Sequence, residues 1–359
     1  MTNCGIHWLT SDELEEWDSF VARHPLGLVY HLSPWQRVLE TAFEHIRGRF
    51  LVLRDGGGQI RAGLPVYTVS SWLLGNRTVS VPFATLGDPL VSTKEESCLL
   101  WPEIEDEARR HGCRRIEIRT RRVSMDCIPT QLAVSARYKH HYLPLDPPSD
   151  ALFRSFDKTT IRQRVEQARR AGVIVEERRD EQGLRLLYAF LVATRRRRCL
   201  PPMPFAFFEA MYRSLGPDHL ALYLAMHKGE AVGGLLVLKF KDLWTAEYSG
   251  TADSATRGSG QLLNWETIQL AKRSGAGCYS FGRTSLDNTG LLDHKRRWST
   301  IEEDLLDFSN CSNSKSTERH EFLNAGIMSV GRNAVRLIEQ FAPARVQTLL
   351  GNFIYRHHG

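Results

Sequence analysis

Two polar residues in the second half of the chain have the chemistry of acid–base groups. Glu247 and Tyr248 lie within a strand predicted over Leu243–Gly250. A carboxylate or phenol on a strand that faces a cleft can exchange a proton with a substrate, so both are candidate catalytic residues. A glutamate on a strand more often points to solvent, and a surface position for Glu247 is the competing interpretation.

A second pair flanks the end of the last predicted strand, which covers Cys278–Thr284. Arg283 and Asp287 lie where open α/β sheets place their ligands, beyond the carboxyl ends of the strands. Asp287 is a candidate to accept a proton or to hold Arg283, and Arg283 is a candidate to bind substrate. A structural turn at Asp287-Asn288 explains the aspartate equally well.

Anion-binding chemistry is the third signal. Gly258 and Gly260 open a predicted helix with Arg257 beside them, and backbone N–H groups in such a turn can bind a pyrophosphate. An ordinary turn explains two glycines at least as well. Upstream stand four consecutive arginines, of which Arg195 and Arg198 are three residues apart and share one helical face. We expect these two to contact an anionic substrate.

Charge and composition define the kind of molecule that positions these residues. The 359 residues carry a net charge of +6, and residues 154–198 alone carry a net +7. The positive field therefore belongs to one region and indicates a local anion site. Apolar and charged fractions of 42% and 25% are typical of a globular protein.

The cysteines and histidines limit the remaining chemistry. The seven cysteines are scattered without a CxxC pair, and the sequence shows neither a leader-like N-terminus nor an apolar run of about 20 residues. These features predict a cytoplasmic protein without a disulfide framework. The pairs His140-His141 and His357-His358 have no Cys, Asp or Glu at ligand spacing, and we predict no metal site.

The chain contains two diverged copies of one arrangement: a β-hairpin, a helix and a closing strand. Both helices end at a glycine, Gly112 or Gly275, where a left-handed C-cap is expected. The copies consist of hairpins at 50–67 and 222–240, helices opening at Trp101 and Trp265, and strands at 115–120 and 278–284, with a proline-rich connector at 144–150 between them. We therefore predict an α/β (α+β) fold of two tandem domains, residues 1–147 and 148–309, each a mixed, mostly antiparallel sheet flanked by helices. Residues 310–359 form a C-terminal tail with an amphipathic helix.

Several segments carry a family resemblance. They are Ser80–Gly87, Ile161–Val173, the basic loop Thr194–Pro204 and, most specific, Phe281-Gly-Arg-Thr284 followed by His294-Lys-Arg-Arg-Trp298. Together they resemble the Fem-type transferases, whose units resemble the GNAT acyltransferase fold. Within that group the chain is most similar to acyltransferase-like proteins associated with bacterial exopolysaccharide loci. It departs from the pattern at Ser299, where glycine is usual, and at Ala255, where the GNAT phosphate loop has Arg or Gln.

The resemblance implies transfer of an acyl or aminoacyl group to an amine or hydroxyl of a cell-envelope or polysaccharide precursor. It makes Lys295 the candidate to contact a donor or acceptor phosphate during catalysis, with Arg296 and Trp298 binding substrate. A solvated basic turn is the competing interpretation of these cations. The first domain has no glycine loop at Leu90–Ser97, so we expect it to be non-catalytic.

Donor and partners remain open at this point. Acyl-CoA and aminoacyl-tRNA are the two candidate co-substrates, and no permanently bound cofactor is expected. The predicted partners are a phosphate-bearing acyl donor, an envelope or polysaccharide precursor and, for the second donor, tRNA. Peripheral contact with the inner face of the membrane is compatible with the amphipathic tail. The alternative is a non-enzymatic binding module whose basic cleft holds an anionic polymer or nucleic acid.

Overall fold

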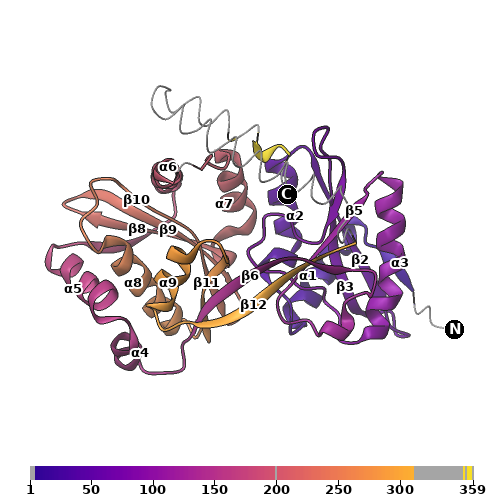
Figure 1. Cartoon of the computed structure of the whole chain (residues 1–359), viewed down its shortest axis with the longest axis horizontal. Helices are drawn as coiled ribbons and strands as arrows, with labels where there is room; N and C mark the ends of the chain where they lie inside the picture. Colours follow the sequence, from indigo (N-terminus) through magenta and orange to yellow (C-terminus); the bar gives the residue numbers. More distant parts are fainter. Residues whose placement is uncertain (1–4, 199, 311–350, 352–353, 358–359) are drawn as a thin grey trace. The chain divides into compact units, whose positions relative to one another are not determined.

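The computed structural model describes residues 5–198, 200–310, 351 and 354–357, and it divides the chain into two compact units (Figure 1). The first unit comprises the chain up to Arg137 and the segment that begins at Leu305, and the second runs from Tyr138 to Asp304. The division falls inside two strands, whereas the sequence placed it in the connector at 147/148. The predicted C-terminal tail with its amphipathic helix lies almost entirely outside the described residues.

The first unit is built on a sheet with the spatial order β1-β2-β3-β4-β5 and the end of β12. Its strand pairs are antiparallel except β4–β5, which is parallel. Helix α3 packs Leu100, Trp101 and Ile104 onto this sheet. The elements are β1 (Ile6–Trp8), η1 (Ser11–Glu13), α1 (Leu14–Arg23), η2 (Val29–His31), α2 (Ser33–Ala42), β2 (Ile46–Arg54), β3 (Ile60–Val69), β4 (Arg77–Val79), α3 (Lys94–Arg110), β5 (Arg115–Thr120), η3 (Met125–Cys127) and β6 (Ala133–Pro144).

The second unit repeats the plan with the order β6-β11-β10-β9-β8-β7, in which β10–β11 is the parallel pair. Helices α6 and α7 cover one face of this sheet, and α5 and α8 cover the other (Figure 1). Cover on both faces explains why β8 and β9 read as nearly continuous apolar runs. The elements are α4 (Ser149–Ser155), the π-helical turn η4 (Lys158–Arg162), α5 (Gln163–Arg170), β7 (Ile174–Arg178), α6 (Glu181–Arg197), α7 (Phe205–His219), β8 (Leu220–His227), β9 (Glu230–Phe240), β10 (Leu243–Thr251), α8 (Ser259–Arg273), β11 (Cys278–Ser285), α9 (Thr289–Arg296) and β12 (Ile301–Ser309).

The structure confirms the predicted fold class of two α/β units with mixed, mostly antiparallel sheets. In both units a hairpin, a third antiparallel strand, a helix, and a strand that runs parallel to the third one follow one another. The glycines predicted to end the helices have positive φ angles, 63° at Gly112 and 85° at Gly275. The helices begin earlier than predicted, because their polar first turns lack the apolar periodicity that the prediction used. No helix in the described ranges is long and apolar enough to cross a membrane.

Candidate functional site

An opening in the sheet of the second unit lies between β10 and β11. The two strands pair only over Leu243–Thr245 and Cys278–Ser280, although both continue several residues further. At that level each strand has an irregularity in its pairing with its other neighbour, at Glu247 in β10 and between Ser280 and Arg283 in β11. An extra residue bends a strand and ends regular pairing, so the two irregularities separate β10 from β11.

A pocket of about 240 Å³ lies at this end of β10. Its volume is slightly below the usual range of small-molecule sites, and it suits a phosphate or a short chain rather than a whole nucleotide. Five elements of the second unit form its walls. They are the end of α6 with Thr194, Arg197 and Arg198, the strands β9 and β10 with Gly234 and Ser249–Thr251, the start of α8 with Gly260, Gln261, Leu263 and Asn264, and α9 and the turn after it with His294 and Trp298.

The first turn of α8 brings backbone N–H groups to the pocket. Leu262 is the first residue of the helix whose N–H bonds back along it, to Gly258 O, so the N–H groups of Gly260 and Gln261 have no acceptor within the helix. Such groups, together with the helix dipole, attract anions. Gly258 itself has φ +96°, and a Cβ there would lie 2.0 Å from Arg164 O. Close packing against α5 therefore already explains this glycine.

Two arginines face the start of α8 across the pocket, and they are not the pair predicted from helical spacing. Arg197 and Arg198 line the pocket, whereas Arg195 lies half-buried on α6 outside the lining. Helix α6 ends at Arg197, so the three-residue spacing no longer relates Arg195 to Arg198. Arg197 pairs with Asp253 and donates to Thr251 O at 3.0 Å. In the sequence, the prolines of the following loop indicate that α6 ends just before them. That helix end is the signal that could have identified Arg197 as a pocket residue.

Lys295 lies on α9 with only 5% of its surface exposed. Its Nζ donates to Gly282 O at 2.9 Å and to Arg283 O at 3.3 Å, so the ammonium is directed at the irregular part of β11. Burial lowers the pKa of Lys295 to about 7, and the Glu247 carboxylate opposes this shift. The structure thus brings together two predicted catalytic residues, Lys295 and Glu247.

Glu247 and Tyr248 are adjacent on β10, at the irregularity in the pairing of this strand with β9. Tyr248 packs its ring edge-on against Phe207 and Phe208 of α7, with a centroid separation of 5.0 Å to Phe208. Gly250, on the same face, lies against the backbone of Phe190 in α6. Tyr248 therefore packs on the face of the sheet that carries α6 and α7.

The other predicted residues beyond β11 lie apart from the pocket. Arg283 places its guanidinium carbon 3.6 Å from the centre of the Tyr138 ring. Asp287 is exposed in the turn before α9, and the adjacent Asn288 caps that helix by accepting a hydrogen bond from Leu291 N–H at 3.2 Å. Arg296 is exposed and forms ion pairs with Glu302 and Asp293, and Arg257 is exposed beside the turn that opens α8.

Trp298 and His294 form the floor of the pocket from α9 and the turn after it. Trp298 is fully buried, with its ring 5.2 Å from that of Phe156 and 5.5 Å from that of Phe281. Its indole Nε1 has no hydrogen-bond partner among the described residues. Burial and the positive charges around His294 lower its pKa, so the imidazole is neutral at pH 7. His294 was missed in the sequence, although its four-residue spacing from Trp298 indicates one face of α9.

The equivalent helix start in the first unit is closed by its own side chains. Thr93 Oγ1 accepts from Glu96 N–H at 3.3 Å, and the buried Glu96 carboxylate accepts from Ser92 N–H at 2.6 Å and from Arg61 at 2.9 Å. This reciprocal cap uses N–H groups that would otherwise attract an anion.

A buried carboxylate also closes the strand end of the first unit. Asp88 Oδ1 accepts from the N–H groups of Arg121, Arg122 and Val123 at 2.7–2.9 Å. Burial raises the pKa of Asp88 to about 6, although these three hydrogen bonds oppose the shift. The first unit thus supplies its own anion at this position.

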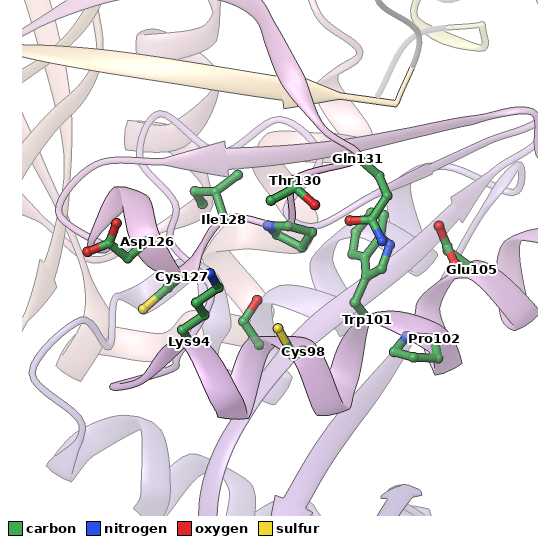
Figure 2. A pocket seen from close by; sticks show the side chains of 12 residues that line it. Lys94, Cys98, Trp101, Pro102, Glu105, Asp126, Cys127, Ile128, Thr130 and Gln131 are labelled. Atoms are coloured by element: carbon green, nitrogen blue, oxygen red, sulfur yellow. The ribbon is translucent and has the colours of Figure 1, made fainter.

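The first unit does contain a larger pocket, of about 340 Å³, between α3 and residues 126–131. Figure 2 shows Lys94 and Asp126 near one end of it, and Trp101 and Gln131 toward the other. Its charged side chains are one lysine, Lys94, and two carboxylates, Asp126 and Glu105. This balance does not favour an anionic ligand, so the pocket of the first unit is a weaker candidate than the pocket at the end of β10.

Comparison with known proteins assigns the second unit to a class. Residues 155–296, from the end of α4 to the end of α9, match the family model described as acetyltransferase (GNAT) domain. The match covers the pocket residues except Trp298, together with the opening between β10 and β11, so the second unit is similar to a GNAT acetyltransferase domain. No curated protein matches the chain.

Solved structures extend the similarity to both units at the level of the fold. FemX superposes with a TM-score of 0.68 at 15% identity, covering 86% of this chain and 98% of FemX. The C-terminal domain of an Agrobacterium fabrum protein named as a lysylphosphatidylglycerol synthetase gives 0.58 at 13%, covering 88% and 96%. A tandem GNAT protein from the clavulanic acid biosynthesis pathway gives 0.54 at 13%, covering 86% and 99%. The chain therefore has the tandem GNAT fold of these proteins.

Proposed function

We propose that the second unit transfers an acyl or aminoacyl group from a phosphate-bearing donor to an amine or hydroxyl. The observation that carries the proposal is the pocket at the end of β10, which Arg197 and Arg198 line together with the start of α8. Guanidinium groups and helix N-termini both bind phosphate. The match of this unit to the GNAT domain family supports the same reaction class.

The residues take distinct roles in this reaction. Arg197, Arg198 and the N–H groups of Gly260 and Gln261 hold a phosphate of the donor. Glu247 takes the proton from the attacking amine or hydroxyl as the new bond to the acyl carbon forms, and the bond to the donor's sulfur or oxygen breaks with its electron pair. The Lys295 ammonium, when protonated, attracts the Glu247 carboxylate. Trp298 Nε1 is a buried donor available to a substrate oxygen.

Donor and acceptor are proposed as classes. The GNAT match supports acyl-CoA as co-substrate. The fold shared with FemX, and with a protein named for synthesis of an aminoacylated lipid, supports an aminoacyl donor, tRNA as its carrier and an envelope or polysaccharide precursor as acceptor. The link to exopolysaccharide loci, the cytoplasmic location and contact with the inner face of the membrane stay predictions from the sequence.

The alternative, a basic module for an anionic polymer, receives less support from the charges. Many arginines of the basic region are engaged in ion pairs, among them Arg169 with Glu166 and Glu266, Arg178 with Asp180, Arg179 with Glu177 and Arg185 with Glu181. Paired guanidinium groups contribute less to polymer binding than free ones. The pocket is also local, whereas a polymer needs an extended basic groove.

Titration with acetyl-CoA tests the proposal. The wild-type protein should bind in the micromolar range, and replacing Arg197 and Arg198 by alanine should raise the Kd by at least about tenfold, as expected for charged hydrogen bonds. Arg195→Ala, outside the pocket, serves as the control and should change the Kd for acetyl-CoA less than about twofold. If acetyl-CoA does not bind, the same variants are compared with aminoacyl-tRNA. Equal binding of either donor by all three proteins would rule out this pocket.

Turnover separates an enzyme from a binding module. With the donor that binds, Glu247→Gln should slow acyl transfer by roughly 100-fold to 10,000-fold, the usual contribution of a general base. Donor affinity should be unchanged, because Glu247 does not line the phosphate pocket. A wild-type protein that binds donor tightly and transfers nothing to amine or hydroxyl acceptors would favour the binding module.

A further inference from the structure

A chain of three hydrogen-bonded side chains lies behind β11 in the second unit. Glu303 Oε2 is 3.2 Å from His140 Nδ1, and His140 Nε2 is 2.9 Å from Ser280 Oγ. His140 and Ser280 are fully buried, and the Glu303 side chain is 24% exposed. With the carboxylate accepting from Nδ1–H, the Nε2 atom is left to accept the Ser280 hydroxyl proton.

The order serine, histidine, carboxylate is that of an activated nucleophile, but the surroundings of Ser280 give it another role. Ser280 has no exposed surface, and its Oγ accepts the N–H of Gly282 at 3.0 Å. A nucleophile must reach a substrate, and this oxygen instead satisfies a backbone group of its own strand. The chain therefore acts on the shape of β11.

The three hydrogen-bonded side chains contact β11 at the irregularity in its pairing, opposite His141. Three residue steps from Ser280 to Arg283 face two steps from Tyr142 to His140, so β11 carries one extra residue there. Gly282 accommodates it with φ +70°. The bulge turns two carbonyl groups, Gly282 O and Arg283 O, toward the Nζ of Lys295.

We propose that Glu303, His140 and Ser280 are positioning residues that hold the bulge of β11 so that its carbonyl groups fix the Lys295 ammonium beside Glu247. Each link is a contact at hydrogen-bond distance, and together the links connect β12, β6, β11 and α9 to the opening beside β10. The inference rests on the proposed function for the role of Lys295 and Glu247 in the reaction.

The pKa of Lys295 depends on its surroundings, so it can report the effect of the three hydrogen-bonded side chains. Among the described residues, the titratable groups that interact with Lys295 are Glu247 from β10, His141 from β6 and His294 on α9 itself. Burial lowers the pKa of both histidines, to about 4 for His141, so Glu247 is the charged neighbour at neutral pH. If the bulge relaxes, water reaches the amine and the pKa of Lys295 rises toward its ordinary value.

The test is a pH titration of the lysine ammonium by ¹H–¹⁵N NMR, with the Lys295 signal identified by its loss in Lys295→Met. Ser280→Ala removes the hydroxyl that caps the bulge, and His140→Leu removes its support. Each should raise the titration midpoint by roughly one pH unit or more as the site gains water. Thr284→Val is the matched control, because it removes a buried hydroxyl on the same strand that has no hydrogen-bond partner among the described residues. It should leave the midpoint where the wild type has it.

Two further variants keep the test decisive. His140→Gln, whose amide oxygen can accept the Ser280 hydroxyl, should return the midpoint most of the way to the wild-type value. Glu303→Gln is at the exposed end of the chain, so it should fold even if His140→Leu does not, and it should shift the midpoint in the same direction. Folded Ser280→Ala and Glu303→Gln proteins with the wild-type midpoint would overturn the proposal.

The outcome is separable from that of the proposed function. If the midpoint moves as expected but no donor supports acyl transfer, the positioning chain stands and the proposed reaction fails. If acyl transfer is observed, the pH–rate profile should shift together with the Lys295 midpoint in Ser280→Ala. Transfer with an unshifted midpoint would refute the positioning chain alone.

Discussion

Replacing Lys295 by methionine should change how the stability of the protein depends on pH. In the folded protein the pKa of Lys295 is about 7, whereas an exposed lysine has about 10.4. The folded state therefore disfavours the charged amine. The resulting cost is fully present below pH 7 and disappears as the pH rises through the unfolded value near 10.4. Converted at 1.36 kcal/mol per pH unit, the total is about 5 kcal/mol.

The diagnostic quantity is the slope of the unfolding free energy against pH, rather than its total change. Between pH 8 and 9 the folded state binds about one proton fewer than the unfolded chain, so the free energy of unfolding should rise by about 1.3 kcal/mol per pH unit from this group alone. Lys295→Met removes that contribution. It also removes two hydrogen bonds to carbonyl groups, but their loss is the same at every pH and leaves the slope unaffected.

Urea unfolding at pH 7, 8 and 9 measures the effect. The difference in unfolding free energy between wild type and Lys295→Met should change by about 1.3 kcal/mol for each unit between pH 8 and 9, in favour of the wild type. Lys94→Met, which removes an exposed lysine of the first unit, should show a constant difference. Parallel curves for wild type and Lys295→Met would refute the burial of a neutral amine at this position.

Two further predictions concern the anion-binding turns. Gly258→Ala should destabilise the protein by at least about 2 kcal/mol, because the new Cβ would lie 2.0 Å from Arg164 O at a positive φ angle. In Gly260→Ala the nearest atom to the new Cβ is 3.6 Å away, so the melting temperature should be nearly unchanged. Asp88→Asn should flatten a pH dependence of the first unit. The folded pKa of Asp88 is raised to about 6, so the contribution of this group to stability falls as the pH rises from about 4 to about 6. A wild-type melting temperature that rises over this interval, with no difference from Asp88→Asn, would contradict the assignment.

The tandem fold was predictable because its markers are local. Gly112 and Gly275 follow helices at equivalent places, and each requires a left-handed conformation that other residues avoid. Hairpins with glycine turns and the order of elements are likewise readable from short windows. The helix starts were misplaced because the first turns of α3 and α8 are polar. The start of α3 is marked by the local capping box of Thr93 and Glu96, whereas Gly258 at the start of α8 packs against Arg164 of another helix.

The site was predictable only in its parts. Glu247 and Lys295 were each candidates, but their proximity depends on bulges in two strands and on the packing of α9 against β11. The choice between Arg195 and Arg197 depends on the residue at which α6 ends, which periodicity alone does not determine. The buried chain of Glu303, His140 and Ser280 joins residues more than a hundred positions apart. The spacing of residues along the sequence does not indicate such contacts.

The two units differ in whether carboxylates of the protein interact with the N–H groups at the helix start and at the strand end. In the first unit, Glu96 caps the start of α3 and Asp88 occupies the N–H groups at the end of β5. In the second unit, α8 begins at a left-handed glycine and has no acidic residue in its first turn. Its positive end is therefore not neutralised from within the helix, and Arg197 and Arg198 add to it. The first unit thus closes these positions with its own carboxylates, whereas the start of α8 in the second unit is where we propose that the donor phosphate binds.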